Sequence, residues 1–259
     1  MKKNKYLCIV QARLGSTRLP GKILKTVNGV SLLEYGVLRI RQAKRVDQIV
    51  IATTTEPGDD AIANLCEKIG VSFVRGSEKD VLDRHAQAIK EYPDYNCVVR
   101  ITSDCPLIDP RVIDDVIDFF EKGDYDYVNN NFLDDPAEES FPEGMDVEVI
   151  KTSVLLEAAA KATMSSEREH VTPYIRNNPK YKKAYFTTDH DFSHIRLSVD
   201  YPQDFEVIEF LIQNSKITDD YLTYVSLLTK HPEVLLKNIH IEKNQWYYKS
   251  LEHDSTFKP

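Results

Sequence analysis

The sequence has few cysteines and no long apolar run, and each absence excludes a class of protein. Its 259 residues include four cysteines, which show no CxxC pair and no Cys/His spacing typical of a zinc site. We therefore expect buried free thiols rather than disulfides or a structural metal. No run approaches the roughly 18 apolar residues of a membrane-spanning helix, and the run at residues 7–10 is too short for a signal peptide. We expect a globular protein of the cytoplasm with no membrane partner.

Two common nucleotide-binding motifs are also absent. The sequence contains no GxGxxG, which removes the main support for a dinucleotide-binding oxidoreductase. The P-loop pattern fails as well, because Ser16 stands where its first glycine would be and Ile23 follows Lys22. A kinase or ATPase of the P-loop class therefore lacks sequence support.

Acidic residues are missing from residues 1–33, which carry seven basic side chains, whereas the other 226 residues carry 26 basic and 41 acidic ones. The formal net charge of −8 argues against a nucleic-acid partner, because such binding neutralises phosphates with Lys and Arg. A positive segment on an acidic protein indicates a site for a small anion. We interpret Lys2, Lys3 and Lys5 as a solvated tail outside that site.

Apolar runs alternate with helical patterns through the first half of the chain. Strands alternating with helices of ten or more residues predict βαβ units, and so an α/β fold with a mostly parallel, Rossmann-like sheet and helices on both faces. Ser31 and Glu34 form a capping box at the start of the first helix, and Asp109 is the expected N-cap of the fourth. The predicted strands are 6–10, 48–52, 71–74 and 97–101, and the predicted helices 32–40, 59–69, 80–90 and 112–120.

The second half of the chain departs from this regular alternation of strands and helices. Without an internal repeat or a Gly/Ser linker, we expect one domain over residues 1–259, with a core of about 5–125 and 185–230 and an inserted β/α elaboration at 126–184 for acceptor binding or dimerisation. The aromatic residues Trp246, Tyr247 and Tyr248 indicate that the tail, 240–259, docks on the body or on another subunit. The pattern predicts strands at 145–150, 185–188 and 195–199, and helices at 154–162, 167–176, 203–212 and 219–228.

The loop after the first strand is the richest in candidate functional residues. Parallel sheets bind ligands at the carboxyl ends of their strands, where this loop lies. Its small residues let backbone amides approach phosphate oxygens, and Arg13 and Lys22 supply charge-assisted contacts to a triphosphate. The alternative is a turn-rich surface loop with incidental basic residues. The candidate nucleotide-binding residues here are Gln11, Ala12, Arg13, Gly15, Ser16, Thr17 and Lys22.

Residues 11–24, QARLGSTRLPGKIL, resemble the opening motif of the sugar-activating cytidylyltransferases. The resemblance is to the SpsF-like branch and, more distantly, to the Kdo and acylneuraminate CMP-transferases, and it covers at least residues 5–213. It implies a nucleotide-diphospho-sugar transferase-like fold and the transfer of CMP from CTP to a sugar hydroxyl with release of pyrophosphate. The end of the loop departs from the acylneuraminate form, so the identity of the acceptor stays open.

Two aspartates follow predicted strands. A carboxylate at a strand's end beside a triphosphate site suits Mg²⁺, which takes carboxylate, phosphate and water oxygens. The resemblance implies that Asp104 and Asp200 are the two metal ligands, with Asp104 joining Arg13 and Lys22 as catalytic residues. The alternative for Asp200 is that it caps the helix at Pro202.

Residues after three strands are candidates for binding the nucleotide. Thr53 ends the second predicted strand, Arg75 follows the third and Ser103 follows the fourth. Hydroxyl, guanidinium and backbone groups can select cytosine by its hydrogen-bonding edge, and the resemblance implies that Arg75 borders the base and ribose. These residues do not separate CTP from UTP, and Arg75 as a solvated turn residue is the alternative.

The acceptor, a small sugar-type molecule, is expected to bind the inserted segment. Residues 141–148, FPEGMDVE, and 167–174, EREHVTPY, resemble two motifs of the SpsF-like branch. Asp146 and Glu148 lie on one face of a predicted strand, where they can bind sugar hydroxyls or act as a base. Arg168 can hold a carboxylate or phosphate, and His170 can orient the acceptor or relay a proton. For Glu167 and Glu169, a purely structural role at a helix start is the alternative.

We expect a homodimer. A glycosyltransferase that uses a nucleotide sugar, and a protein that binds nucleotide without reacting, are the alternative functions. His190 and His194 lack the helix that would place them on one face, so they do not indicate a zinc site.

Overall fold

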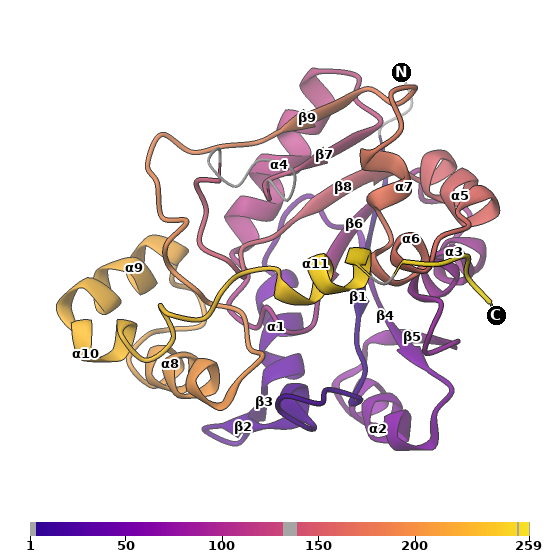
Figure 1. The fold of residues 1–259 in the computed structure, drawn as a ribbon. Helices are drawn as coiled ribbons and strands as arrows, with labels where there is room; N and C mark the ends of the chain where they lie inside the picture. Colours follow the sequence, from indigo (N-terminus) through magenta and orange to yellow (C-terminus); the bar gives the residue numbers. More distant parts are fainter. Residues whose placement is uncertain (1–3, 132–138, 253, 259) are drawn as a thin grey trace.

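A computed structural model describes residues 4–131, 139–252 and 254–258, apart from the Trp246 side chain; Lys2 and Lys3 of the expected tail lie outside it. Within these residues, one seven-stranded sheet has the order β5-β4-β1-β6-β8-β7-β9 (Figure 1). β5, β4, β1 and β6 run parallel, β8 is antiparallel to β6 and β7, and β9 is parallel to β7. The predicted α/β fold is confirmed. The strands are β1 (Tyr6–Gln11), β4 (Gln48–Thr54), β5 (Ser72–Gly76), β6 (Cys97–Thr102), β7 (Tyr127–Asn129), β8 (Glu148–Lys151) and β9 (Lys183–Tyr185).

Helices cover both faces of this sheet. Side chains alternate along β1, so that Cys8 and Val10 face one core while Leu7 and Ile9 face the other. All four are at most 2% exposed, and each such burial contributes about 1.5–3 kcal/mol to folding. The first core holds α1 (Leu32–Ile40), α2 (Asp60–Ile69), α4 (Pro110–Lys122), α8 (Pro202–Gln213) and α9 (Tyr221–Lys230); the second holds α3 (Val81–Glu91), α5 (Thr152–Lys161) and α7 (Pro173–Arg176).

Capping residues fix the starts of the main helices as the sequence predicts. The Ser31 hydroxyl accepts a hydrogen bond from the Glu34 amide at the start of α1. Asp109 caps α4 in the same way, with Pro110 in the first turn, where its missing N–H is not needed. The short elements are β2 (Thr26–Val27), β3 (Val30–Ser31), η1 (Lys22–Leu24), η2 (Pro57–Asp59), α6 (Ser165–His170), α10 (Pro232–Leu235) and α11 (Gln245–Glu252).

Two predicted elements of the second half are wrong in detail. The helix expected at 167–176 is two helices, α6 and α7, because Val171 adopts a φ of 72° and Pro173 cannot continue the hydrogen bonds of α6. The expected strand at 195–199 makes a single bridge, between Arg196 and Glu143. Its alternate residues are buried, but its backbone bonds to Glu143 and Asp104 instead of a neighbouring strand.

The segment 126–184, expected to elaborate the core, supplies β7, β8 and β9 to the same sheet. The sequence analysis missed β7, which has three residues, and placed β9 two residues too late. β8 begins at Glu148 and not at Met145, because Met145 closes a turn onto Pro142 and Val147 bonds to the Asn130 side chain. The start of β8 therefore moves because a turn and a side-chain hydrogen bond replace the ladder there.

All four cysteines are free and buried, as expected. Burial raises the pKa of both Cys66 and Cys97 to about 12, so these thiols stay protonated and unreactive at neutral pH.

Gly144 should not tolerate a side chain. Its φ is 98°, and a Cβ there would lie 2.6 Å from the backbone carbon of Leu197. We expect Gly144→Ala to lower the free energy of unfolding by about 3 kcal/mol or more, measured by urea denaturation. Gly58 is the matched control, because a Cβ there meets no atom within 4 Å. Equal stabilities of the two alanine variants would contradict the close contact.

The buried His85 side chain should make the fold sensitive to acid. Its Nδ1 donates to the Val81 carbonyl at 2.9 Å, and Nε2 is buried without a partner in the described part of the chain. Burial, aided by repulsion from Arg100, lowers the pKa of His85 to about 3. An unfolded histidine takes up a proton below about pH 6.5, so the folded state loses stability as the pH falls from that value towards the folded pKa.

From pH 6.5 to pH 5 we therefore expect His85 to remove about 2 kcal/mol from the free energy of unfolding. Urea titrations at a series of pH values measure this loss. The His85→Gln variant should give a flatter profile, and equally steep profiles for both proteins would show that His85 is not the group responsible.

Candidate active site

The candidate site lies at β1, where the order of the strands reverses: β4 and β5 lie on one side of β1, and β6 lies on the other. β4 pairs with one edge of β1 and β6 with the other, so the loops after β1 and β6 start side by side at the carboxyl ends of parallel strands, where such sheets bind ligands. The Ser103 amide donates to the Gln11 carbonyl at 3.1 Å, and the Ala12 amide donates to the Ala52 carbonyl at 3.1 Å. The two loops therefore start from fixed positions.

Lys22 joins two aspartates at this edge. Gly21 adopts a φ of 64° before η1, a conformation that glycine takes without strain. The Lys22 Nζ atom lies 3.1 Å from Asp104 Oδ2 and 2.8 Å from Asp200 Oδ1. The Val199 amide donates to the Asp104 carbonyl, which ties the segment before Asp200 to the loop after β6. The structure thus brings Lys22, Asp104 and Asp200 together.

Asp200 lies among three cations. Besides Lys22, it accepts hydrogen bonds from Arg18 at 2.6 Å and from Arg196 at 3.0 Å. It does not cap α8: Asp204 takes that role, accepting from the Asp200 and Tyr201 amides, both at 2.9 Å. The capping alternative for Asp200 is therefore wrong.

The charges at this centre stabilise one another. Burial alone would raise the pKa of Asp104, but the Lys22 ammonium and hydrogen bonds to the carboxylate, including one from Thr102, together outweigh it and lower that pKa to about 2. Burial alone would lower the pKa of Lys22, but Asp104 and Asp200 together raise it above its usual value. Both groups are therefore charged throughout the physiological range.

The loop after β1 is held at its ends and open in the middle. The Leu14 amide donates to Asp59 at 2.8 Å, and the Leu19 amide donates to the Ser16 hydroxyl at 3.3 Å. Gly15 and Thr17 are exposed, and Ala12 is buried. The Arg13 guanidinium is 38% exposed and 3.6 Å from Glu78, a loose ion pair from which it can turn to a ligand.

The two candidates near the base differ in how they are held. The Thr53 side chain is fully buried, and its hydroxyl has no partner among the described residues. Arg75 donates to the carbonyls of Thr54 and Glu56 and pairs with Asp60 at 2.7 Å. Arg75 therefore ties β4 and β5 to the start of α2, and it is not a solvated turn residue.

Gln11 and Glu148 belong to one buried polar network on the α3 side of the sheet. Arg100, which sequence reasoning missed, donates to Gln11 Oε1 from Nε and Nη2, at 3.1 and 2.9 Å, and pairs with Glu148. Glu148 also accepts from the Tyr127 and Thr172 hydroxyls. Burial alone would raise the pKa of Glu148, but Arg100 and the hydrogen bonds from Tyr127 and Thr172 together outweigh it and lower that pKa.

Asp146 is placed differently. It precedes β8, so the expectation that it shares a strand face with Glu148 is wrong. It accepts hydrogen bonds from the Gly144 amide and the Asn131 side chain, and burial raises its pKa. Asp146 and Glu148 therefore have separate sets of partners.

Arg168 and His170 face the tail and α3. Arg168 donates to Asp80, the N-cap of α3, and to the Ala159 carbonyl. His170 bonds at 2.7 Å to Ser250 of α11, the helix that lies across the front of the sheet (Figure 1). Burial lowers the pKa of His170 to about 4, so it is neutral at pH 7. These two residues contact neither Asp146 nor Glu148 in the described hydrogen bonds.

The helix that carries Arg168 and His170, α6, is held in place by a cap and by contacts with the tail. Glu167 accepts from the Thr163 and Met164 amides, at 2.9 and 3.0 Å, and so caps the start of α6. The tail packs against the same helix, because the Ser166 amide donates to Asp254 and the Tyr247 ring contacts His170. The docking of the tail on the body is confirmed.

Sequence reasoning missed four charged residues of the site: Arg18 and Arg196 on Asp200, Glu143 on Arg196, and Arg100 beside Gln11. Arg196 is 4% exposed and joins Glu143, Asp200 and Asp204. A charged residue inside the apolar alternation of 195–199 was the available signal, because such a residue needs buried partners. Burial raises the pKa of Glu143 to about 7.

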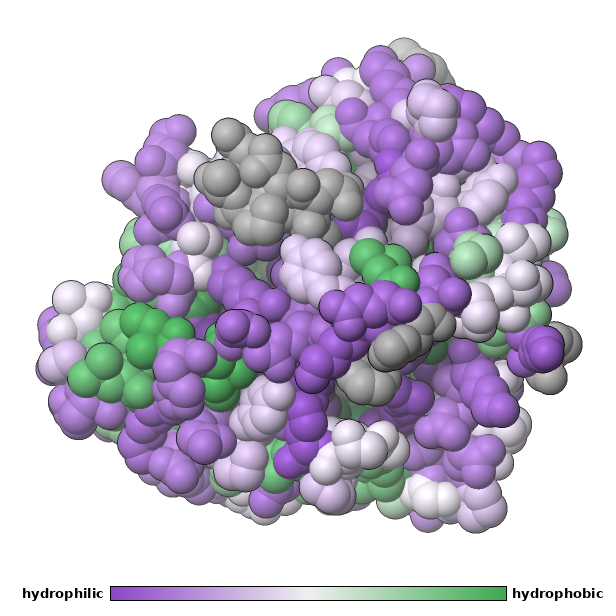
Figure 2. Space-filling view, in the orientation of Figure 1, coloured by the Kyte–Doolittle hydropathy of each residue, from purple (hydrophilic) through white to green (hydrophobic). Residues whose placement is uncertain are grey.

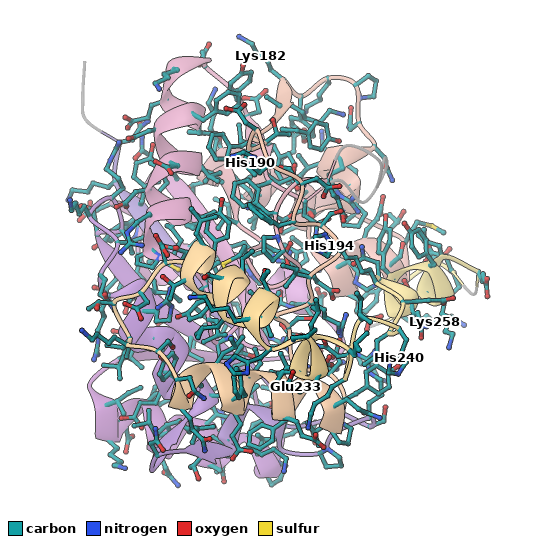
Figure 3. All side chains as sticks on the ribbon, turned by 90° about the vertical axis from the view of Figure 1, so that its left-hand side faces the viewer. Lys182, His190, His194, Glu233, His240 and Lys258 are labelled. Carbon is teal, nitrogen blue, oxygen red and sulfur yellow. The ribbon has the colours of Figure 1, made fainter. Side chains whose placement is uncertain are left out.

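The residues fit a divalent cation that is shared with a ligand. Carboxylate oxygens of Asp104 and Asp200 both lie within 3.1 Å of one atom, so one hard cation can contact both. Across the described residues, no group of three or more His, Cys, Asp or Glu side chains could hold a metal. Figure 3 shows His190, His194 and His240 well apart from one another. A metal here would take its other ligands from phosphate and water.

Comparisons with known proteins agree on one family. Residues 7–228 match the family model described as cytidylyltransferase. The spore coat polysaccharide biosynthesis protein SpsF of Bacillus subtilis is 34% identical over 242 residues, which cover 89% of this chain and 96% of SpsF. A solved cytidylyltransferase from Leptospira borgpetersenii is 32% identical, with a TM-score of 0.85 over 93% of this chain and all of that one.

A more distant solved structure shares the fold. It is a CMP:2-keto-3-deoxy-manno-octonic acid synthetase complexed with CTP, and it is 15% identical, with a TM-score of 0.63 over 82% of this chain and 99% of that one.

Proposed function

Because the chain belongs to the cytidylyltransferase family, we propose that it transfers CMP from CTP to a hydroxyl of a sugar acid, a sugar phosphate or a related polyol, with release of pyrophosphate. The observation that supports this most directly is the meeting of Asp104 and Asp200 at Lys22, beside the basic loop after β1. This arrangement places two carboxylates and several cations where a triphosphate and its metal would bind.

The mechanism is an in-line attack of the acceptor oxygen on the α-phosphorus of CTP. Arg13 and Lys22 bind the triphosphate, aided by the amides of the open loop and by Ser103. Mg²⁺ on Asp104 and Asp200 would neutralise the charge that grows on the leaving pyrophosphate. The chain itself contributes positioning and charge complementarity, which carry most of the catalysis in phosphoryl and nucleotidyl transfer.

The base and ribose lie on the other side of the loop in this proposal. Thr53 offers a buried hydroxyl without a partner in the described residues, which a cytosine or ribose group can satisfy. Arg75 acts by fixing the ends of β4 and β5 relative to each other. Gln11 is oriented by Arg100.

The proposed acceptor-binding residues are Asp146, Glu148, Arg168 and His170. Glu148 acts through Arg100, which it holds towards Gln11. Asp146 is held in place by the Gly144 amide and the Asn131 side chain. His170 is neutral at pH 7, which suits hydrogen bonding to a hydroxyl.

Pyrophosphate release tests the proposal. The purified protein with Mg²⁺ is incubated with CTP, UTP, ATP or GTP, each against a panel of acidic sugars, sugar phosphates and polyol phosphates. We expect pyrophosphate from CTP with one acceptor class. A parallel reaction supplies a nucleotide sugar in place of the nucleoside triphosphate, and release of the nucleotide with transfer of its sugar there would make the protein a glycosyltransferase. Tight CTP binding with no turnover on any acceptor would make it a non-catalytic binder.

Loss of the Lys22 ammonium should weaken nucleotide binding. Its charge-assisted contacts are each worth about 1.5–3 kcal/mol, so we expect Lys22→Ala to raise the KM for CTP by about 10- to 100-fold. Steady-state kinetics at varied CTP measure this. Lys25→Ala is the control, since the Lys25 ammonium lies over the Phe205 ring, 4.9 Å from its centroid. An unchanged KM in the Lys22 variant would remove Lys22 from triphosphate contact.

We further propose that the protein acts in the cytoplasm, as a homodimer, in surface polysaccharide biosynthesis. The SpsF relative, named for spore coat polysaccharide biosynthesis, supports the pathway. No helix of the described residues is long and apolar enough to cross a membrane. Figure 2 shows an apolar patch over α9 and α10, where Leu222, Leu236 and Ile239 are exposed, and it supports self-association. Light scattering coupled to gel filtration decides the oligomeric state.

A further inference from the structure

Lys22 lies where the proposed function puts a metal ion. We infer that the Lys22 ammonium holds the place of the divalent cation before nucleotide binds, so that metal enters the site together with CTP and not ahead of it. This inference rests on the proposed function, because it takes Asp104 and Asp200 as the metal ligands.

The geometry leaves no room for a second cation. Lys22 Nζ lies 3.1 Å from Asp104, 2.8 Å from Asp200 and 2.6 Å from the Val199 carbonyl. These three contacts use all three N–H donors of an ammonium group. Lys22 is 9% exposed, so water screens this centre only weakly. A metal that contacted both carboxylates would occupy the position of Nζ, and the two cations would repel each other strongly at that separation.

The two aspartates differ in what remains when Lys22 leaves. Asp200 keeps Arg18 and Arg196, whereas Asp104 has Lys22 as its partner in the described ion pairs. Withdrawal of Lys22 therefore leaves Asp104 as an uncompensated carboxylate, which a divalent cation would neutralise. Removing the lysine without supplying the metal is unfavourable, so each event needs the other.

A triphosphate can drive this exchange. The Lys22 side chain is a flexible four-carbon stem at the start of η1, a single turn that follows Gly21. The phosphate oxygens of CTP offer the ammonium new anionic partners and offer the metal additional ligands. Nucleotide and metal should therefore bind cooperatively, each strengthening the other's binding by the same factor.

Binding of Mn²⁺ alone, without nucleotide, tests the inference. Calorimetry or electron paramagnetic resonance gives the affinity of the wild type and of two variants, Lys22→Met and Lys22→Gln. We expect both variants to bind Mn²⁺ at least about tenfold more tightly than the wild type, which corresponds to 1.4 kcal/mol. Lys22→Gln keeps a hydrogen-bond donor towards the carboxylates and decides the result if the methionine variant does not fold.

Two controls locate the gained affinity. Lys25→Met, three residues further along the chain, should bind Mn²⁺ like the wild type. Adding Asp104→Asn to the Lys22→Gln variant should remove the gain. Equal or weaker Mn²⁺ binding by both Lys22 variants would overturn the inference, as would a gain that survives the loss of the Asp104 carboxylate.

Wild-type crystals give a measurement that needs no substitution. Soaked in MnCl₂ with a non-hydrolysable α,β-methylene analogue of CTP, they should show anomalous scattering between Asp104 and Asp200, with Lys22 Nζ moved to the phosphates. A manganese peak at that position without nucleotide would overturn the inference. None of these measurements requires turnover, so a failure of the transferase proposal, seen as no pyrophosphate release by the wild type, is distinguishable from a failure here.

Discussion

The Asp104→Asn variant should lose nucleotidyl transfer and keep its fold. Asparagine has nearly the same shape as aspartate but no charge, so it cannot neutralise a metal or hold the leaving pyrophosphate's counter-ion. We expect kcat to fall by about 10²- to 10³-fold or more, as for the loss of one essential charge-stabilising group. Pyrophosphate release at saturating CTP and Mg²⁺ measures the loss, and thermal unfolding checks the fold.

Asp118→Asn is the matched control for that experiment. Asp118 lies on α4, is 49% exposed, and pairs with Arg45 and not with Lys22, Asp104 or Asp200 in the described ion pairs. Its variant should retain wild-type turnover. Full activity in the Asp104 variant, with the control unchanged, would remove Asp104 from the metal role.

Replacing Arg196 by methionine should be the most destabilising single change at the centre. Its guanidinium is 4% exposed and donates to Asp204 at 2.9 Å, to Asp200 at 3.0 Å and to Glu143. Methionine fills similar space but leaves three buried or half-buried carboxylates without this partner. Removing one member of a buried ionic network costs about 3–5 kcal/mol, and we expect a loss of that size in urea denaturation.

Arg111→Met shows what the same substitution does on the surface. The Arg111 side chain is 55% exposed and lies 3.3 Å from Asp220. Exposed pairs contribute about 0–1 kcal/mol, so this variant should be nearly as stable as the wild type. If the Arg196 variant is no less stable than the Arg111 variant, the carboxylates around Arg196 are not held by it.

The parallel half of the fold was predictable because its signals are local. The apolar runs of β1, β4 and β6 are long enough to identify as buried strands, and Ser31 and Asp109 mark helix starts with their own side chains. β7 was missed because three residues cannot show a period. The segment 195–199 has the alternation of a strand, but which neighbour its backbone bonds to depends on the fold around it.

The sequence could predict which loops form the candidate site, but it could not predict which side chains contact one another there. The order of the strands places the loop after β1 beside Asp104, and the sequence suffices for that. The capture of both aspartates by Lys22 depends on the left-handed Gly21 and on how the Val199 backbone meets Asp104, which are tertiary facts. The same holds for Glu148, whose partners come from β6, β7 and the turn before α7.

The docked tail also decides how the protein should be handled. Residues up to Phe257 are in register with the chain before α6, since the Phe257 amide donates to the Thr163 carbonyl and the Ser165 amide to the Ser255 carbonyl. An affinity tag fused after the last residue would emerge beside Arg168, whose guanidinium lies over the Phe257 ring. Purification tags and fluorescent fusions should therefore be placed at the amino end, which leaves the contacts between the tail and α6 undisturbed.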